Sequence, residues 1–348
     1  MRIGIVNDLS LAREALRRVV QAMPGHRVAW LARDGAEAID LTKKDRPDLI
    51  LMDLIMPGLD GAEATRQIMA DHPCPILVVT ATVSGHMNKV YEAMGHGALD
   101  AVDTPCLGPL GQVSGANDLI EKIATVGKLI GSTVEPVPLH VPPRPAPMER
   151  QRLGTLVLLG ASTGGPKALA EVLTGLPAGL QAAVIIVQHI DSDFAPGLAA
   201  WLGDQSGHRV EVVTPGHRPE PGTILLAGTD DHLVMTPGRV LDYDPDPKHY
   251  HFRPSVDVFF ASVAAHWPDP GVAALLTGML RDGAEGLLKL RQDGWHTIAQ
   301  DGPSCVVWGM PKAAAEIGAA EQILPVDQIA RAIAVRVGIK ASARESAG

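Results

Sequence analysis

A serine within a glycine-rich turn is the first feature of this sequence that suggests chemistry. Ser162 lies in the stretch Gly160-Ala-Ser-Thr-Gly164, between an apolar run and an amphipathic, helix-like segment. This G-x-S-x-G spacing is typical of a strand–turn–helix elbow that exposes a serine hydroxyl as a nucleophile. A phosphate loop would need Gly-Lys-Ser/Thr where Pro166 intervenes, and a dinucleotide site would need a glycine at position 162. A helix N-cap is the structural alternative for this serine.

A serine hydroxyl becomes a good nucleophile when a base removes its proton and an acid orients that base. His189 directly follows the apolar run "AAVIIVQ", and Asp282 follows the run "VAALLTGMLR". Taken singly, His189 fits a buried core histidine and Asp282 fits a helix N-cap. Together with Ser162 they predict a triad of nucleophile, base and orienting acid. The chain order Ser–His–Asp differs from that of the α/β-hydrolases, so we expect a different topology.

A second group of polar residues follows strand-like runs in the first half of the chain. Asp8 follows the first apolar run, Asp53 the third and Thr80 the fourth, with Asn7 beside Asp8. Carboxylates placed in this way can share Mg²⁺, which prefers oxygen ligands, and one of them can accept a phosphoryl group. Helix N-caps are again the alternative for these acidic residues.

The elements that would position these residues alternate between short apolar runs and amphipathic segments, as in a parallel α/β fold. The 348 residues favour two domains. We predict a first domain over 1–125, a proline-rich linker over 126–152, a second domain over 153–340 and a disordered tail over 341–348. The predicted strands are 2–6, 27–32, 48–54, 75–81 and 98–102 in the first half, and 154–160, 182–189, 223–228, 239–243, 271–278 and 296–300 in the second.

The composition excludes several classes of protein. The net charge is −9 and Lys and Arg do not cluster, which argues against nucleic acid as a ligand. The three cysteines lack metal-site spacing and suit a reducing compartment. There is no apolar run of 18 residues and no signal pattern, so we expect a cytoplasmic protein without direct membrane insertion.

The first half resembles the receiver domain of bacterial two-component response regulators. The resemblance rests on "VND", "DLILMDLIMPGLDGAEATRQI" and "VVTAT" and covers residues 1–125. It implies a doubly wound, flavodoxin-like fold that is phosphorylated on Asp53. It also implies that Asp8 and Asp53 bind Mg²⁺, that Asn7 stands at a ligand position, and that Thr80 responds to the phosphoryl group.

This half departs from the receiver pattern at three positions. Asn7 replaces a second acidic residue, Thr104 replaces the lysine that precedes a proline, and Ala101 replaces a residue that is often aromatic. A charge-assisted contact of the kind that the lysine makes contributes ~1.5–3 kcal/mol. We therefore expect phosphorylation at Asp53 to persist, with an altered coupling to the rest of the protein.

The second half resembles the catalytic domain of the CheB chemotaxis methylesterases. The segments "GASTGGPKAL", "VQHI", "HYHFRPSVDVFF" and "LTGMLRDGAEGL" support this resemblance, and "MGHGALDAVDTP" in the first half resembles the WspF branch of the family. It implies a Rossmann-like parallel α/β esterase domain with Ser162, His189 and Asp282 as the triad. The backbone N–H groups of Thr163 and Met279 become candidate oxyanion donors. The family has glycine at the position of Leu280.

These resemblances predict an enzyme that hydrolyses glutamate γ-methyl esters and, as a second activity, glutamine amides on a methyl-accepting chemoreceptor-like protein. A CheA-type histidine kinase would be the phosphodonor, and no cofactor is needed for the esterase step. We expect the unphosphorylated receiver to cover the Ser162 cleft. The alternative is a catalytically quiet adaptor, in which a receiver is linked to a receptor-binding domain.

Overall fold

The structure is a computed structural model of the 348-residue chain, and it describes all residues except 82–85, 109–111, 132–153, 249, 251 and 338–348. It divides into two compact units, residues 1–134 and 135–348, each with its own sheet and core. Most of the predicted linker and the whole predicted tail lie outside the described residues. Among the helices within the described ranges, none combines the length and apolarity needed to cross a membrane.

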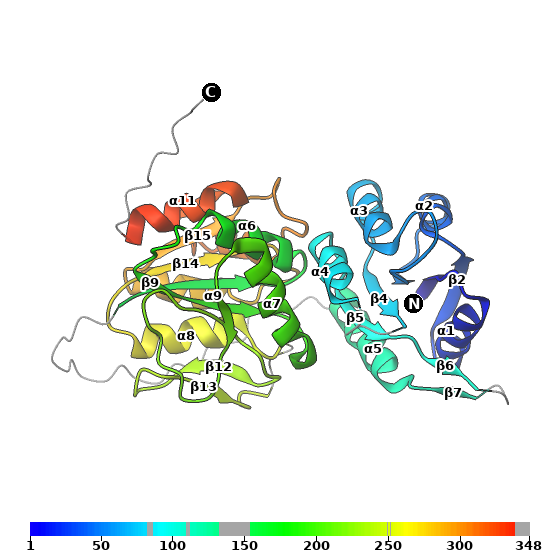
Figure 1. Ribbon diagram of the computed structural model, residues 1–348, viewed down its shortest axis with the longest axis horizontal. Helices are drawn as coiled ribbons and strands as arrows, with labels where there is room; N and C mark the ends of the chain where they lie inside the picture. The colour runs from blue at the N-terminus through cyan, green and yellow to red at the C-terminus, as the bar shows by residue number, and fades with distance from the viewer. Residues whose placement is uncertain (82–85, 109–111, 132–153, 249, 251, 338–348) are drawn as a thin grey trace, which may run out of the picture. The chain divides into compact units, whose positions relative to one another are not determined.

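The first unit is a five-stranded parallel sheet in the order β2-β1-β3-β4-β5, which is the flavodoxin-like order expected for a receiver (Figure 1). Helices α1 and α5 cover one face with apolar residues such as Leu16 and Ile123, and α2, α3 and α4 pack together on the other. The strands are β1 (Arg2–Val6), β2 (Arg27–Ala32), β3 (Leu49–Met52), β4 (Ile76–Thr80) and β5 (Asp100–Asp103), and the helices are α1 (Ser10–Ala22), α2 (Gly35–Lys44), α3 (Gly61–Asp71), α4 (Met87–Gly95) and α5 (Asn117–Gly131).

Two details of this unit differ from the sequence prediction. A short antiparallel pair, β6 (Cys106–Leu107) and β7 (Val113–Ser114), was not expected. Residues 126–131, which the predicted linker included, belong to α5, as a helix predicted over about 116–131 requires. The physical reason is that the apolar spacing of this helix continues, with Val126 buried in the core beside Ile123.

The second unit is a seven-stranded parallel sheet in the order β10-β11-β9-β8-β14-β15-β16. Its central strands are almost continuously apolar and buried on both faces, as parallel strands between two helical layers are. The strands are β8 (Thr155–Ala161), β9 (Ala182–Gln188), β10 (Val210–Val212), β11 (Ile224–Leu226), β14 (Val272–Leu275), β15 (His296–Gln300) and β16 (Gln322–Leu324).

Two groups of helices enclose this sheet. Helices α8, α9 and α10 share one apolar core with the sheet, while α6, α7 and α11 pack together on the other side. The helices are η1 (Ser192–Phe194), α6 (Gly165–Gly175), α7 (Ala195–Ser206), α8 (Val256–His266), α9 (Ala284–Gln292), α10 (Met310–Glu316) and α11 (Val326–Val337).

The predicted strand at 239–243 does not join the main sheet. It corresponds to β13 (Leu241–Asp244), which pairs antiparallel with β12 (His232–Met235) in a separate two-stranded sheet. Strands β10, β12 and β16 were not predicted, because each contains a polar residue and forms no apolar run like the one around β11. The order of the central strands is more consequential. The chain passes from β8 to β9 on one side of β8, and after β13 and α8 it returns to place β14 on the other side. Ligands bind at such a switch point, beyond the carboxyl ends of the strands.

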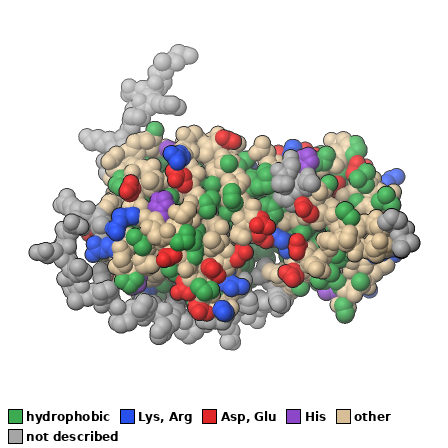
Figure 2. Space-filling model, turned by 60° about the horizontal axis from the view of Figure 1, so that its bottom comes forward, with side chains coloured by type: hydrophobic (Ala, Val, Ile, Leu, Met, Phe, Trp, Pro, Cys, Tyr) green, Lys and Arg blue, Asp and Glu red, His purple; other side chains and the backbone are tan. Residues whose placement is uncertain are grey.

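The surface charge agrees with the composition. Figure 2 shows that Lys and Arg side chains are interspersed with Asp and Glu on the face it draws, rather than gathered into a basic patch among the described residues.

Candidate functional sites

Ser162 lies in a tight turn between β8 and α6, at the switch point of the second sheet. Its N–H donates to the carbonyl of Thr277 (3.0 Å), and its carbonyl accepts from the N–H of Gly165 (2.7 Å). Gly164 has φ +79°, and a Cβ at this position would lie 2.6 Å from Val306 Cβ, so the turn requires glycine. The N-cap of α6 is Gly164 rather than Ser162. The structure therefore excludes the N-cap alternative for the serine.

The register of the sheet brings His189 next to Ser162. Strands β8 and β9 pair with Ala161 opposite Gln188, and the N–H of His189 donates to the carbonyl of Ala161 (3.0 Å). Ser162 and His189 therefore follow paired positions on adjacent strands. The buried amide of Gln188 also links them, since its Nε2 donates to the carbonyls of Ser162 (2.9 Å) and His189 (3.0 Å). Sequence reasoning missed this glutamine, whose only signal was its polarity at the end of an apolar run.

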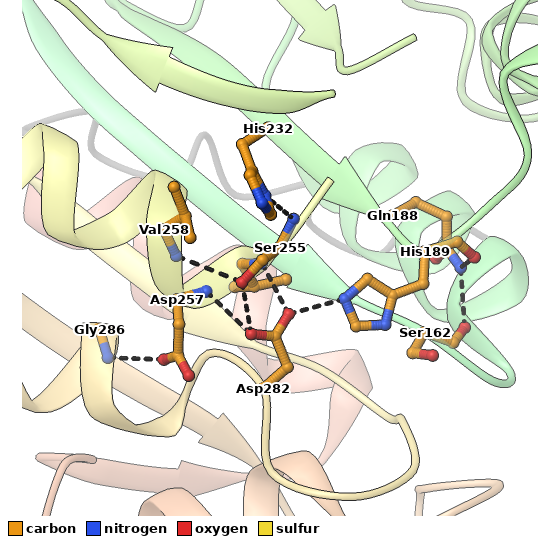
Figure 3. Close-up of polar contacts among 10 residues, drawn as sticks. Ser162, Gln188, His189, His232, Ser255, Asp257, Val258, Asp282 and Gly286 are labelled. Carbon is orange, nitrogen blue, oxygen red and sulfur yellow. Dashed lines mark hydrogen bonds and ion pairs between the residues drawn. The ribbon is translucent and has the colours of Figure 1, made fainter. Parts of the chain in front are cut away.

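Asp282 forms the second contact of the imidazole. His189 Nε2 lies 2.7 Å from Asp282 Oδ2, and both side chains are buried. A proton on Nε2 that is donated to this carboxylate leaves the lone pair on Nδ1. Nδ1 is buried and has no hydrogen-bond partner among the described residues. Figure 3 shows Ser162 on the side of the ring away from Asp282. The Ser162 hydroxyl forms no hydrogen bond within the described part of the chain, so a serine–histidine bond is not present.

The N-terminus of α8 holds the Asp282 carboxylate (Figure 3). Besides the imidazole, the carboxylate accepts hydrogen bonds from Ser255 Oγ (2.7 Å), Val256 N (2.7 Å) and Asp257 N (3.2 Å). Burial acts to raise the pKa of Asp282, but the hydrogen bonds from His189, Ser255 and Val256 outweigh it and lower the pKa below its usual value. The carboxylate is thus kept ionised at a helix N-terminus. It does not cap α9, whose N-cap is Gly283.

The buried side chain of His232 is hydrogen-bonded to Ser255, the residue whose hydroxyl donates to Asp282. Ser255 N donates to His232 Nδ1 (3.1 Å), and His232 Nε2 is 3.2 Å from the carbonyl of Pro247. Burial lowers the pKa of His232, which favours the neutral imidazole that can accept from Ser255. Neither Ser255 nor His232 was predicted to belong to the site. The serine carries a recognisable signal, because it is also the N-cap of α8, accepting from Val258 N.

The two candidate oxyanion donors lie in neighbouring turns. Among the described residues, the backbone N–H groups of Thr163 and Met279 have no hydrogen-bond acceptor. The Thr277 hydroxyl donates to the carbonyl of Thr163 (2.9 Å), and a Cβ built on Gly278 would lie 2.8 Å from Ser162 Cβ. Leu280 follows with φ +61°, a conformation that favours glycine. These turns leave two unused donors near the serine, and the leucine is strained.

The receiver pocket is centred on Asp53, which is buried at the end of β3. Its carboxylate accepts from Leu54 N (2.7 Å) and from Asn7 Nδ2 (2.9 Å). Burial raises the pKa of Asp53 to about 6, and the nearby Asp8 carboxylate contributes to this shift. Asn7 directs its amide nitrogen at Asp53, while its Oδ1 accepts from Leu9 N (2.9 Å). In this conformation Asn7 does not offer its oxygen to a cation.

The carboxylates of Asp8 and Asp53 fit Mg²⁺, which keeps several waters and needs few protein ligands. A cation placed between the two carboxylates would offset the burial and the repulsion from Asp8 that raise the pKa of Asp53. No cluster of three or more His, Cys, Asp or Glu side chains suited to a metal occurs within the described ranges. Thr80 is buried at the end of β4, and its carbonyl accepts from Thr104 N (2.8 Å). The Thr104 hydroxyl, at the position of the missing lysine, is buried and has no described partner.

Comparisons with known proteins match both halves of the chain. The family model of the CheB methylesterase matches residues 157–333, and that of the response regulator receiver domain matches residues 3–107. Over 341 residues the chain is 52% identical to "Protein-glutamate methylesterase/protein-glutamine glutaminase 3" of Burkholderia orbicola, which covers 97% of this chain and 99% of the relative. It is 50% identical over 334 residues to the protein of the same name from Pseudomonas aeruginosa, and the alignment covers 96% of this chain and 99% of that protein.

A solved structure matches the second unit. The CheB methylesterase catalytic domain of Thermotoga maritima is 34% identical, and the match covers 52% of this chain and 97% of that domain with a TM-score of 0.49.

Proposed function

Because this chain belongs to the CheB methylesterase family, with a response regulator receiver domain at its N-terminus, we propose that it hydrolyses glutamate γ-methyl esters on a methyl-accepting, chemoreceptor-like protein. It is an enzyme of the protein-glutamate methylesterase/protein-glutamine glutaminase type. The observation that supports the mechanism is the His189–Asp282 pair beside Ser162, with Nδ1 of the imidazole left without a partner.

In the first step the Ser162 oxygen attacks the ester carbonyl while its proton passes to His189 Nδ1. We expect the hydroxyl to reach Nδ1 by rotation about χ1, since the two residues follow paired strand positions. Asp282 holds the Nε2–H edge of the ring and stabilises the imidazolium that forms. The N–H groups of Thr163 and Met279 would receive the oxyanion, and one such donor contributes about 2.7–4 kcal/mol.

In the second step the imidazolium returns its proton to the leaving methoxide, and methanol departs. A water molecule, deprotonated by the same Nδ1, then cleaves the acyl-enzyme and restores the glutamate carboxylate and the serine. The same sequence with a primary amide releases ammonia and converts glutamine to glutamate. No cofactor takes part in these steps.

The receiver supplies the regulation in this proposal. Asp53 is the residue that would accept a phosphoryl group from a CheA-type histidine kinase, and Asp8 with Asp53 would hold the Mg²⁺ that offsets the charge of the transferred group. Asn7 donates to Asp53 and so fixes the carboxylate that is to be modified. The buried Thr80, next to Thr104, would respond to the modification. We assign the protein to the cytoplasm and, from the "MGHGALDAVDTP" segment, to a WspF-like branch.

The test is methanol release from a methylated receptor fragment. The unsubstituted full chain should release methanol, and Ser162→Ala should reduce the rate to background, because the serine oxygen forms the acyl bond. Ser192→Ala is the matched control, since that hydroxyl bonds only to Asp230 on an exposed turn among the described residues. If Ser162→Ala hydrolyses the ester as fast as the control, the proposed mechanism is wrong. If the unsubstituted chain releases no methanol, the adaptor alternative is favoured.

A further inference from the structure

Phe252 lies flat against the imidazole of His189. The two ring centroids are 4.1 Å apart and the ring planes differ by 9°. Phe252 belongs to the segment between β13 and α8, three residues before Ser255. The same short segment therefore places an aromatic ring on the face of the imidazole and hydrogen-bond donors on the carboxylate that orients it.

The stacked ring covers a face of the imidazole and blocks neither of its nitrogens. Nε2 is bonded to Asp282, and Nδ1 is the atom that would take the serine proton. Phe252 can contact only the ring face, and the His189 side chain is 7% exposed. Stacking thus removes water from this face and restricts rotation of the ring about its χ2 bond.

The charge of the imidazole changes during the reaction, and the interaction with Phe252 should change with it. Neutral imidazole gains only dispersion energy from a stacked phenyl ring. Once the Ser162 proton has moved to Nδ1, the ring carries a positive charge, and a cation over an aromatic face is attracted by the ring's quadrupole. An interaction that strengthens as charge develops lowers the barrier rather than simply tightening the ground state.

We propose that Phe252 is a positioning residue that fixes the plane of His189 and stabilises its imidazolium form during acylation. The inference rests on the proposed function, since it requires His189 to act as the base. Asp282 supplies the opposite charge at the ring edge, and Phe252 supplies a weaker, shape-dependent attraction at the face. The two contributions are separable because they act on different parts of the ring.

The test weakens the quadrupole of Phe252 while keeping its shape. Mono-, di- and trifluorophenylalanine are introduced at position 252 of the full chain, and the single-turnover rate of methanol release is measured. We expect the rate to fall with each added fluorine, by about 3- to 10-fold in total. The KM should not change, because the ring contacts the base and not the substrate. Phe252→Tyr, which keeps the ring face, should retain the rate, and Phe252→Leu should lose about as much as the trifluoro variant.

The matched control is the same fluorination at Phe259. That ring is fully buried in α8, where it packs against Phe260 at 6.1 Å between centroids, and its fluorination should leave the rate unchanged. A rate that does not respond to fluorination at 252, in a protein that hydrolyses the ester, overturns the role of Phe252 alone. If the unsubstituted protein releases no methanol, the proposed function is wrong and this inference falls with it.

Discussion

The carboxylate of Asp282 accepts four hydrogen bonds, and three of them come from the first residues of α8. The fourth comes from His189. The position of the base is therefore set by a helix that begins 26 residues before the acid in the sequence, and Ser255 is the residue whose side chain joins the two.

Ser255→Ala tests that connection. The substitution removes a hydrogen bond to a buried carboxylate, which contributes about 1.5–3 kcal/mol, and it removes the N-cap of α8. We expect kcat to fall by about 10-fold and the melting temperature to decrease. Ser262→Ala, on the same helix but bonded to Phe259 and Met235, should lower stability without lowering kcat. Equal loss of kcat in the two variants would contradict a positioning role for Ser255.

Asp257 is the counterpart of Asp282 at the second helix. Its Oδ1 accepts from Gly286 N (2.7 Å) in the first turn of α9. The N-terminus of α9 is thus bonded to a carboxylate of α8, and the N-terminus of α8 is bonded to Asp282, which lies just before α9. Burial, together with the neighbouring Asp282 carboxylate, raises the pKa of Asp257 well above its usual value. A neutral Asp257 beside an ionised Asp282 avoids placing two buried negative charges together.

Asp257→Asn should therefore change stability in a pH-dependent way. Above the unfolded-state pKa of about 4, the folded wild-type protein binds more protons at this position than the unfolded chain does, so its stability falls as the pH rises. Asparagine still accepts from Gly286 but does not titrate. We expect the melting temperature of the variant relative to wild type to be higher at pH 7 than at pH 4.5. A difference that is equal at both pH values, or reversed, would show that Asp257 is ionised in the folded protein.

At the scale of the elements, the turn after β14 carries a local strain. Leu280 has φ +61°, a left-handed conformation that costs a residue with a Cβ about 1–2 kcal/mol. The glycine expected from the family resemblance would avoid this cost. The turn also carries Met279, a candidate oxyanion donor, so its backbone geometry bears on the reaction.

Leu280→Gly should stabilise the second unit by about 0.5–1 kcal/mol, after allowing for the greater entropy of glycine in the unfolded chain. The free energy of unfolding in urea is measured for Leu280→Gly, Leu280→Ala and the unsubstituted protein. Alanine keeps the Cβ, so Leu280→Ala should show no gain in stability over the unsubstituted protein. A loss of stability with glycine would mean that side-chain packing of Leu280 outweighs the backbone strain.

The sequence predicted the elements that carry the three residues of the proposed triad, because each of these residues follows a long apolar run. Such runs are strands in a parallel sheet, and their carboxyl ends meet at one edge. Ser255, His232 and Phe252 were not predicted to act at the site, because their roles depend on where the segment before α8 lies relative to β9 and β14. Hydrophobic periodicity carries no information on such contacts. Strands β10 and β16 have three residues each and include Glu211 and Gln322, so they form no apolar run, whereas the equally short β11 is wholly apolar.

At the scale of the whole molecule, a receiver is joined to an esterase unit in one chain. The two units have separate sheets and separate cores. The departures at Asn7 and Thr104 lie in the receiver pocket alone. The residues proposed for catalysis belong entirely to the second unit.

Removal of residues 1–150 tests whether the receiver inhibits the esterase. If the unphosphorylated receiver covers the Ser162 cleft, the remaining fragment should hydrolyse methylated receptor faster than the full chain does without a phosphodonor. Addition of a small-molecule phosphodonor should raise the rate of the full chain and leave that of the fragment unchanged. An unchanged or lower rate in a folded fragment would argue against occlusion.

The central claim is that Ser162 is a nucleophile activated by His189. The most direct measurement is the rate at which a fluorophosphonate ester labels the full chain, with the labelled peptide identified by mass spectrometry. We expect a single adduct on Ser162 that forms at a rate strongly reduced by His189→Gln. Labelling that is absent from the native protein, or that proceeds equally fast without the imidazole, would contradict it.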